Sequence, residues 1–237
     1  MAGHSKWKNI KHKKALVDAK KAKKFTRITK EITVAAKIGG GDTSTNPSLR
    51  LLIQKANEIN MPKENYTRAI KRGTGEIKGG TYEYCLYEGY GPENISIIVE
   101  VLTDNKNRAI NDLREAFNHN GGRITDNGCV SWMFERTGLI NGIKENINEE
   151  ELLELLIDFE IINIEVDEND FIIICNPNES NNIKTVLIDN NYKIEEINIG
   201  YYAKDKIILS ELQQEKVSEF LQNLESIDDV QNVYTNI

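Results

Sequence analysis

The sequence contains few cysteines, with only three among 237 residues. Cys85, Cys129 and Cys175 are far apart and odd in number, which argues against a disulfide framework and favours a reducing cytoplasm. No apolar run approaches the ~18 residues of a membrane helix. No apolar segment follows the cationic start, so we expect no secretory signal. An organellar transit peptide is a second interpretation of that start, but its continuation into an expected helix favours a cytoplasmic protein.

The sequence also lacks the motifs of nucleotide-binding enzymes. Neither glycine-rich stretch, GGGDTST at 39–45 or GYGPEN at 89–94, fits a Walker or dinucleotide-binding pattern. The cysteines at 85 and 129 have no nearby histidine that could activate a nucleophile. His4 and His12 have no further metal-ligating residues beside them. We therefore expect no catalytic residue, no metal, no cofactor and no small-molecule substrate.

An acidic run, EEELLEL at 149–155, is the remaining candidate for chemistry. Its leucines suit packing, so its glutamates are most simply the solvated face of a helix. A hydrolytic carboxylate pair stays open, and with it an enzyme such as a nuclease.

Charge is divided unevenly along the chain. Residues 1–80 hold 19 Lys and Arg against 6 Asp and Glu, a net of +13, whereas residues 81–237 hold 11 against 31, a net of −20. Within residues 6–30, eleven of 25 are basic and only Asp18 is acidic. Such asymmetry indicates that the basic part contacts nucleic acid or another anionic surface. The alternative is a solvated basic helix that pairs with the acidic part of its own chain.

Apolar periodicity predicts three helices in the basic part. A stripe at 3.6-residue spacing runs from Ala15 to about Ile38 and ends at three glycines. A second helix begins at Pro47 and a shorter third follows Pro62, with Gly73 as its stop. The expected inward residues are Phe25, Ile28, Ile32, Ala35, Ala36, Leu49, Leu52, Ile53, Ala56, Tyr66, Ala69 and Ile70.

Beyond residue 80 the apolar period changes from 3.6 to 2, which predicts strands. Two strands and a helix precede GCVSWMFERTG (128–138), which we expect to be a strand pair or a long, bent strand. Residues 138–200 then follow the order βαββαβ of a ferredoxin-like unit. The last helix and strand complete the earlier piece. We predict an α+β protein: a helical domain (1–80), a discontinuous α/β domain (81–137 plus 201–237) and an inserted ferredoxin-like domain (138–200).

Several stretches carry a resemblance to a known family. MAGHSKWKNIKHKKA, NMPKENYTRAIKRGTG, EGYGPENISIIVEVLTDNKNR, AFNHNGGRI and FERTGLI occur in this order, and together they resemble the YebC/PmpR family, whose mitochondrial relatives activate translation of cytochrome c oxidase. The resemblance spans essentially the whole chain and is densest over 1–140; residues 138–237 match only in outline.

The resemblance implies an N-terminal three-helix domain followed by two ferredoxin-like α/β domains, one inserted in the other. It also implies a non-enzymatic regulator. Most members are described as DNA-binding transcriptional regulators, and others as ribosome-associated factors that assist elongation through difficult, proline-rich sequences.

The basic segments are the candidate nucleic-acid-binding residues. Lysines contact phosphates without reading base sequence, and an indole stacks on an unpaired base. Because base reading would use Arg, Asn or Gln, the lysine-rich composition favours structured RNA or non-specific DNA. The candidates are Lys6, Trp7, Lys8, Lys11, His12, Lys13, Lys14, Lys20, Lys21, Lys23, Lys24, Arg27, Arg68, Lys71 and Arg72.

Three of these assignments have local alternatives. Trp7 is equally suited to packing against the helices. The cluster at 68–72 ends a helix, where cations interact favourably with the helix dipole, by ~0.3–1 kcal/mol. In LTDNKNR (102–108), Asn105, Asn107 and Arg108 form a possible partner loop, but Thr103, Asp104 or Asn105 as a helix cap is the simpler interpretation.

The expected partner is therefore nucleic acid, either DNA or RNA on the ribosome, with ribosomal or transcription proteins as possible further partners and no membrane. A protein-only adaptor, whose basic helix docks on an acidic partner, is the alternative to a nucleic-acid-binding protein.

Overall fold

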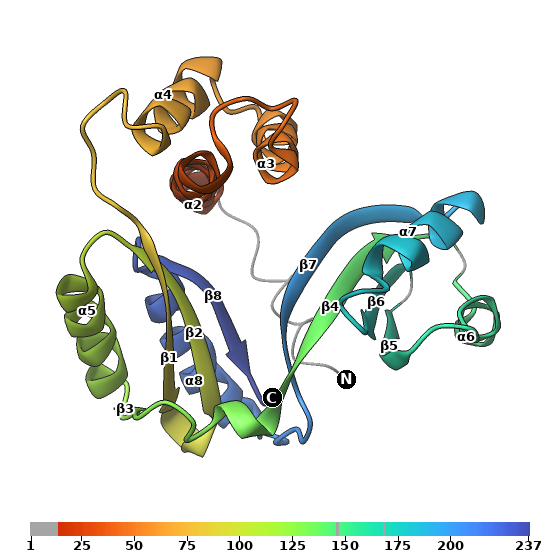
Figure 1. Ribbon diagram of the computed structural model, residues 1–237. Coiled ribbons are helices and arrows are strands. Elements are labelled where there is room, and N and C mark those ends of the chain that lie inside the picture. The colour runs from red at the N-terminus through yellow and green to blue at the C-terminus, as the bar shows by residue number, and fades with distance from the viewer. Residues whose placement is uncertain (1–13, 146, 168) are drawn as a thin grey trace. The chain divides into compact units, whose positions relative to one another are not determined.

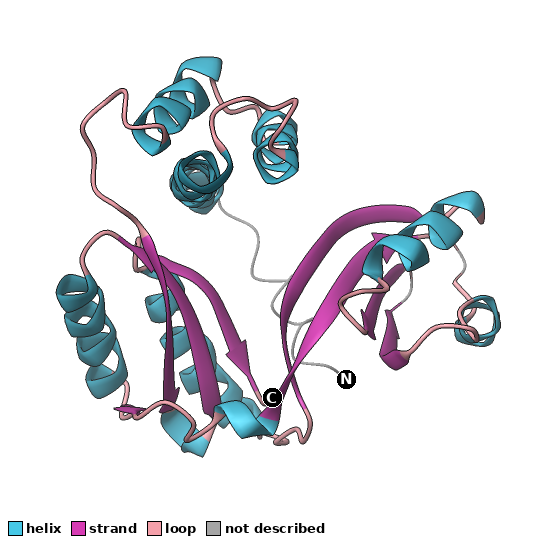
Figure 2. Ribbon diagram, viewed as in Figure 1, coloured by secondary structure: helices cyan, strands magenta, loops and turns pink. Residues whose placement is uncertain are grey.

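The computed structural model describes residues 14–145, 147–167 and 169–237, with side chains from residue 22 onward. In this part of the chain, three helices come first and two four-stranded sheets with their covering helices follow (Figures 1 and 2). The predicted α+β class is confirmed.

The three N-terminal helices pack around a small apolar core. Helix α2 spans Lys14–Gly39, α3 Pro47–Glu58 and α4 Lys63–Gly73, and α2 packs against both of the others. The side chains predicted to point inward do so. Fully or almost fully buried are Ile32, Leu49, Ala56, Met61 and Ala69, and partly buried around them are Phe25, Ile28, Ala35, Leu52, Ile53, Tyr66 and Ile70.

The turn between α2 and α3 is fixed by one buried asparagine. Gly40, at φ +81°, follows the end of α2 in the left-handed conformation that glycine adopts without strain. Asn46 accepts a hydrogen bond from the Leu49 N–H at 3.0 Å, and its amide donates to the carbonyls of Ala35 and Gly40, each at 2.9 Å. One side chain therefore caps α3 and ties it to the end of α2.

Helix α4 ends where it touches α2 most closely. A Cβ at Gly73 would overlap the Thr33 carbonyl oxygen and lie 2.7 Å from the Ala36 Cβ. Only glycine fits this contact, so Gly73 both stops α4 and sets the distance between the two helices.

The first sheet has the order β3-β1-β2-β8, with β2 inside the sheet and its side chains almost all buried. Helices α5 and α8 pack against each other, with the Phe117 and Phe220 rings edge to face at 5.1 Å. The elements are β1 (Glu83–Tyr90), β2 (Ser96–Thr103), α5 (Lys106–His119), β3 (Arg123–Thr125), α8 (Glu211–Ser226) and β8 (Val230–Thr235).

The second sheet has the order β5-β6-β4-β7 and the element order βαββαβ, the ferredoxin-like arrangement. It occupies one continuous stretch between β3 and α8, so one α/β part is inserted in the other, as expected. Its core gathers around Ile140, Leu152, Phe171 and Ile183. The elements are β4 (Phe134–Ile143), α6 (Glu149–Leu155), β5 (Ile161–Asp167), β6 (Asp170–Cys175), α7 (Ser180–Asp189) and β7 (Lys193–Ala203).

Two details differ from the sequence prediction. GCVSWMFERTG (128–138) was expected to be a strand pair or a long, bent strand, but Ser131–Met133 form a short 3-10 helix, and only the last five residues of the stretch belong to β4, which continues to Ile143. Gly138 lies within this strand and pairs with Cys175 of β6. The lack of a side chain at Gly138 lets Ser180 pack against the strand, since a Cβ there would overlap the Ser180 hydroxyl. The short strand β3, which pairs with β1, was not predicted; its three residues are too few for an alternating pattern.

The described residues fall into two compact units. One contains 14–129 and 209–233, and the other contains 130–208 and 234–237. The first unit therefore joins the three helices to the first sheet. The division of the chain at residues 80, 137 and 200 stays a prediction.

The helical core gives a first test. Ile32→Ala removes a fully buried side chain, and we expect it to lower the free energy of unfolding by ~2–5 kcal/mol, measured by urea denaturation. Leu51→Ala, at a position 60% exposed on α3, is the matched control and should change it by less than ~0.5 kcal/mol. Equal effects of the two substitutions would show that the core lies elsewhere.

Candidate nucleic-acid interface

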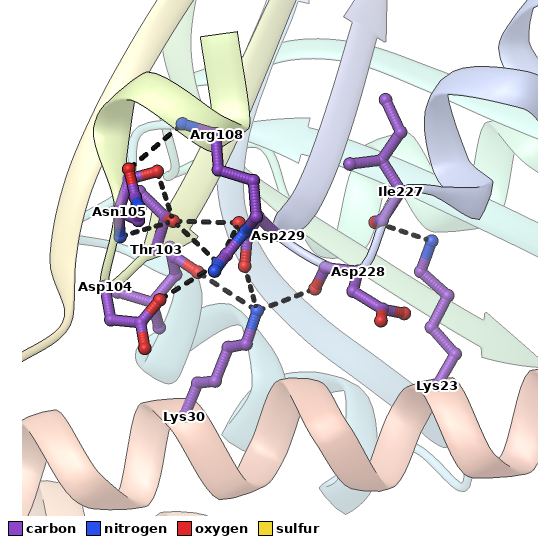
Figure 3. A network of polar contacts seen from close by, with 10 residues as sticks. Lys23, Lys30, Thr103, Asp104, Asn105, Arg108, Ile227, Asp228 and Asp229 are labelled. Carbon is purple, nitrogen blue, oxygen red and sulfur yellow. Dashed lines mark hydrogen bonds and ion pairs between the residues drawn. The ribbon is translucent and has the colours of Figure 1, made fainter. Parts of the chain in front are cut away.

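Helix α2 presents cations of two kinds. Lys23, Arg27 and Lys30 are spaced four and three residues apart, so they share one helix face. All three hydrogen-bond to the segment that ends α8 and begins β8 (Figure 3 shows Lys23 and Lys30). Lys24 lies off this face and is exposed.

Lys30 is buried, and its ammonium group is fully hydrogen-bonded. It donates to the Asp229 carboxylate at 2.6 Å, to the Asp228 carbonyl at 2.8 Å and to the Leu102 carbonyl at 3.3 Å. An ammonium has three N–H donors, so each has an acceptor. The side chains of Lys30 and Asp229 are 7% and 5% exposed, and a charge at such depth is tolerated only when it is paired in this way.

Asp229 is the centre of the network in Figure 3. Its second oxygen accepts from the Thr103 hydroxyl at 2.8 Å and from the Arg108 guanidinium at 2.7 Å. Burial alone would raise the pKa of Asp229, but the hydrogen bonds from Lys30, Arg108 and Thr103 outweigh burial and hold that pKa below its ordinary value.

The loop at 103–108 is a cap that completes this network. Asn105 precedes α5, and its side chain accepts from the Arg108 N–H at 3.0 Å, as the capping interpretation predicted. The Arg108 guanidinium also pairs with Asp104 at 2.9 Å, and its two carboxylate partners raise the pKa of Arg108. Asn105 and Arg108 thus have partners within the chain, and Asn107 is exposed.

Lys23 and Arg27 contact the same segment of the chain less deeply. The Lys23 ammonium donates to the Ile227 carbonyl at 3.2 Å, and Arg27 donates to the Asn232 amide oxygen at 3.0 Å. Burial, with Arg27 close by, lowers the pKa of Lys23 to about 8. Lys23, Arg27 and Lys30 therefore make contacts within the chain, as the alternative interpretation of the basic helix expected.

A second set of candidate cations is exposed. Lys71 and Arg72 follow Arg68 on α4 by three and four residues, so all three side chains lie on one side of that helix. Within the part of the chain that the structure describes, none of these three or Lys24 forms an ion pair. Such side chains are available to an external anion.

The remaining candidates cannot be placed as side chains. The α2 backbone includes residues 14, 20 and 21, whose side chains are not described. Six candidates lie outside the described residues: Lys6, Trp7, Lys8, Lys11, His12 and Lys13.

Sequence reasoning missed the buried members of the network. Lys30 continues the helical spacing of Lys23 and Arg27, a signal that it shares their face. No signal pointed to Asp229, because 199 residues separate it from Lys30.

The network borders an open cleft of about 1020 Å³ with the opposite charge. Six carboxylates and only two cations, Lys30 and Arg108, line it, so the cleft is net negative and repels a polyanion. The carboxylates are Asp104, Asp112, Glu115, Glu219, Asp228 and Asp229.

Among the residues that the structure describes, no three His, Cys, Asp or Glu side chains are grouped as metal ligands. In the same residues, no helix combines the length and apolar character that crossing a membrane requires.

These features define an α+β protein with a basic helical domain and an acidic remainder. Comparison with known proteins identifies its family. The model of the TACO1/YebC protein N-terminal domain matches residues 5–76, and the model of the TACO1/YebC second and third domain matches residues 82–237. The chain belongs to the TACO1/YebC family, as its motifs predicted.

Curated relatives and a solved structure agree with this assignment. A probable transcriptional regulatory protein of Caldanaerobacter subterraneus subsp. tengcongensis is 48% identical over 100% of this chain and 98% of its own length. Another of that description, from Thermotoga maritima, is 44% identical over 100% and 93%. The crystal structure of a conserved hypothetical protein from Aquifex aeolicus superposes with a TM-score of 0.81 at 40% identity, covering 96% of this chain and 94% of that one.

The buried ion pair gives a second test. Asp229→Ala leaves the Lys30 ammonium buried without its counter-ion, so we expect a loss of ~3–5 kcal/mol in the free energy of unfolding at neutral pH. Because the pKa of Asp229 is lowered in the folded state, this contribution is present above the ordinary value of 3.8 and disappears as pH falls through the folded value. Denaturation at several pH values measures both effects. Asp228→Ala, at the exposed neighbouring carboxylate, should have little effect; an equal loss would contradict the special role of Asp229.

The lowered pKa of Lys23 gives a third test. Between about pH 8 and the ordinary value of 10.5, the unfolded chain holds a proton on Lys23 that the folded chain has lost. Wild-type stability relative to Lys23→Met should therefore rise across this window. Chemical denaturation across that range measures the difference, and Lys24→Met controls for loss of a surface charge. A difference that falls with pH would contradict the desolvation of Lys23.

Proposed function

We propose that this chain is a nucleic-acid-binding regulator that acts on transcription through DNA. The observation that carries the proposal is the group of exposed cations on the helical domain, Lys24 on α2 and Arg68, Lys71 and Arg72 on α4, which have no ion-pair partner in the described part of the chain. The descriptions of the relatives as probable transcriptional regulatory proteins support the biological role.

Electrostatics limits how such a regulator meets a polyanion. The helical domain carries the positive charge, whereas the acidic cleft beside the Asp229 network repels phosphates. We therefore expect nucleic acid to contact α2 and α4 at exposed cations that do not line that cleft. Lys23, Arg27 and Lys30 contribute to the long-range field but are committed to contacts within the chain.

One observation favours RNA on the ribosome as a second candidate. Of the 19 cations in residues 1–80, 15 are lysines. Lysine is a point charge that contacts phosphates without the forked geometry that recognises a guanine edge. This composition suits binding to the backbone of a structured nucleic acid, so a translation factor stays the alternative to a regulator of promoters.

Salt dependence tests the proposal. Binding to ~6–10 phosphates makes the affinity fall ~10³–10⁵-fold between ~50 and ~200 mM salt. Replacing Lys24, Arg68 and Lys71 with Gln should weaken binding to labelled duplex DNA and flatten the plot of log affinity against log salt by about one unit per lost phosphate contact. Fluorescence anisotropy measures both.

A matched control removes three charges elsewhere. Lys184, Lys193 and Lys204 are exposed on the second unit, and their replacement with Gln should leave the slope unchanged. Equal losses in the two triple variants would mean that only net charge matters and that the helical domain is not the interface. Co-sedimentation with ribosomes, without retention on duplex DNA, would replace the transcriptional role with the translational one.

A further inference from the structure

The first unit contains a second hollow, of about 290 Å³, at the ends of two helices. The last turn of α2 and the end of α4 form two of its walls. The segment that runs from α4 to β1, seen in Figure 1 between those elements, forms the third. One water molecule occupies about 30 Å³ of the liquid, so the hollow has room for a small polyatomic anion and its remaining water.

Glycines shape the third wall. Gly75, at φ +82°, turns the chain after α4, and its N–H donates to the Arg72 carbonyl at 3.2 Å. Gly79 lies under the Arg72 side chain, with a Cβ position 3.4 Å from the Arg72 methylenes. At Gly80 a Cβ would lie 2.6 Å from the Asp104 carboxylate. Gly75 and Gly80 are thus the two positions where this path favours glycine, and residues 78–80 lie outside any helix or strand.

Three cations line the hollow, and none of its lining residues is a carboxylate. Lys37, Arg72 and Lys78 are exposed and form no ion pair within the described part of the chain. Three acids lie near the hollow but outside its lining, and one of them, Asp104, pairs with Arg108 at 2.9 Å. Glu76 accepts from the Thr74 hydroxyl at 2.9 Å, and Glu83 pairs with Lys106 at 2.6 Å.

Helix dipoles do not account for three cations at this place. The C-terminal end of each helix carries about half a negative charge, so the ends of α2 and α4 together supply about −1. The three cations of the lining exceed this by about two positive charges, with Glu76, Glu83 and Asp104 outside the lining. The lining by itself is therefore net positive, as an anion site requires.

We propose that this hollow binds a phosphate group through Lys37, Arg72 and Lys78. Under the proposed function, on which this step rests, the group is one phosphate of the nucleic-acid backbone. Gly79, Gly80 and Tyr82 also line the hollow. Arg72 was a candidate from sequence; Lys37 and Lys78 were not, and the hollow joins them into one site.

The first experiment tests the site without nucleic acid. Isotope-labelled full-length protein is titrated with inorganic phosphate at constant ionic strength, and the amide resonances of Gly79 and Gly80 are followed by NMR. We expect saturable shifts that are lost when Lys37 and Lys78 are both replaced with Gln. Replacing Lys55 and Lys63, exposed lysines of the same domain outside the hollow, should preserve them. The site would be overturned if phosphate did not shift the Gly79 and Gly80 amide resonances, or if it shifted them equally after Lys37 and Lys78 were replaced with Gln.

The second experiment identifies the source of the phosphate. Both lysines are proposed to contact the same phosphate. Replacing Lys37 and Lys78 with Gln should therefore lower the slope of log affinity against log salt by about one unit, and replacing Lys55 and Lys63 should leave that slope unchanged. A reduction of about two units would mean two separate phosphates and would overturn a single site.

The two proposals fail in different ways. If the protein binds nucleic acid and the double Gln variant of Lys37 and Lys78 binds it with the same salt slope, the hollow holds no phosphate of the nucleic acid, but the proposed function stands. If inorganic phosphate shifts the glycine amides but no nucleic acid binds, the phosphate site stands with a small-molecule ligand, and the proposed function fails.

Discussion

The carboxylate of Asp229 is the contact on which the first unit depends. It joins Lys30 of α2 to Thr103 at the end of β2 and Arg108 of α5, and all three partners are more than 100 residues from Asp229 in the sequence. Each partner supplies a hydrogen bond that compensates for removing charge from water. Because Lys30 also donates to two carbonyls of the α/β part, the long basic helix is held against the acidic part of its own chain at one defined place.

This contact sorts the cations of the helical domain into two groups. Lys23, Arg27 and Lys30 face the end of α8 and the start of β8, where they offset some of the negative charge that the chain carries after residue 80. The cations on α4 and at the end of α2 have no such partners in the described residues. The basic charge of the helical domain therefore has two roles: part of it stabilises the fold, and part is available to a ligand.

The first unit contains regions of opposite charge, the open cleft and the smaller hollow. The larger is net negative and the smaller is lined by cations, with Tyr82 bordering both. Under the proposed function, a polyanion would be repelled by the first and attracted by the second, and the electrostatic field would orient it before direct contact. Relatives that match the full length of this chain are described as probable transcriptional regulatory proteins, a role for which an oriented approach to a polyanion is useful.

The sequence by itself predicted the helices and most of the strands, because apolar spacing, Pro47 and the glycines after α2 act within a few residues of where they stand; it did not predict β3, which is too short for an alternating pattern. It also determined the ferredoxin-like order of the second sheet and the family. Only the tertiary structure decided which cations are buried, since Lys30 and Lys24 have the same chemistry and differ in the side of the helix they occupy. The pairing of Lys30 with Asp229, and the meeting of Lys37, Arg72 and Lys78, likewise depend on contacts between distant segments, for which a local pattern carries no signal.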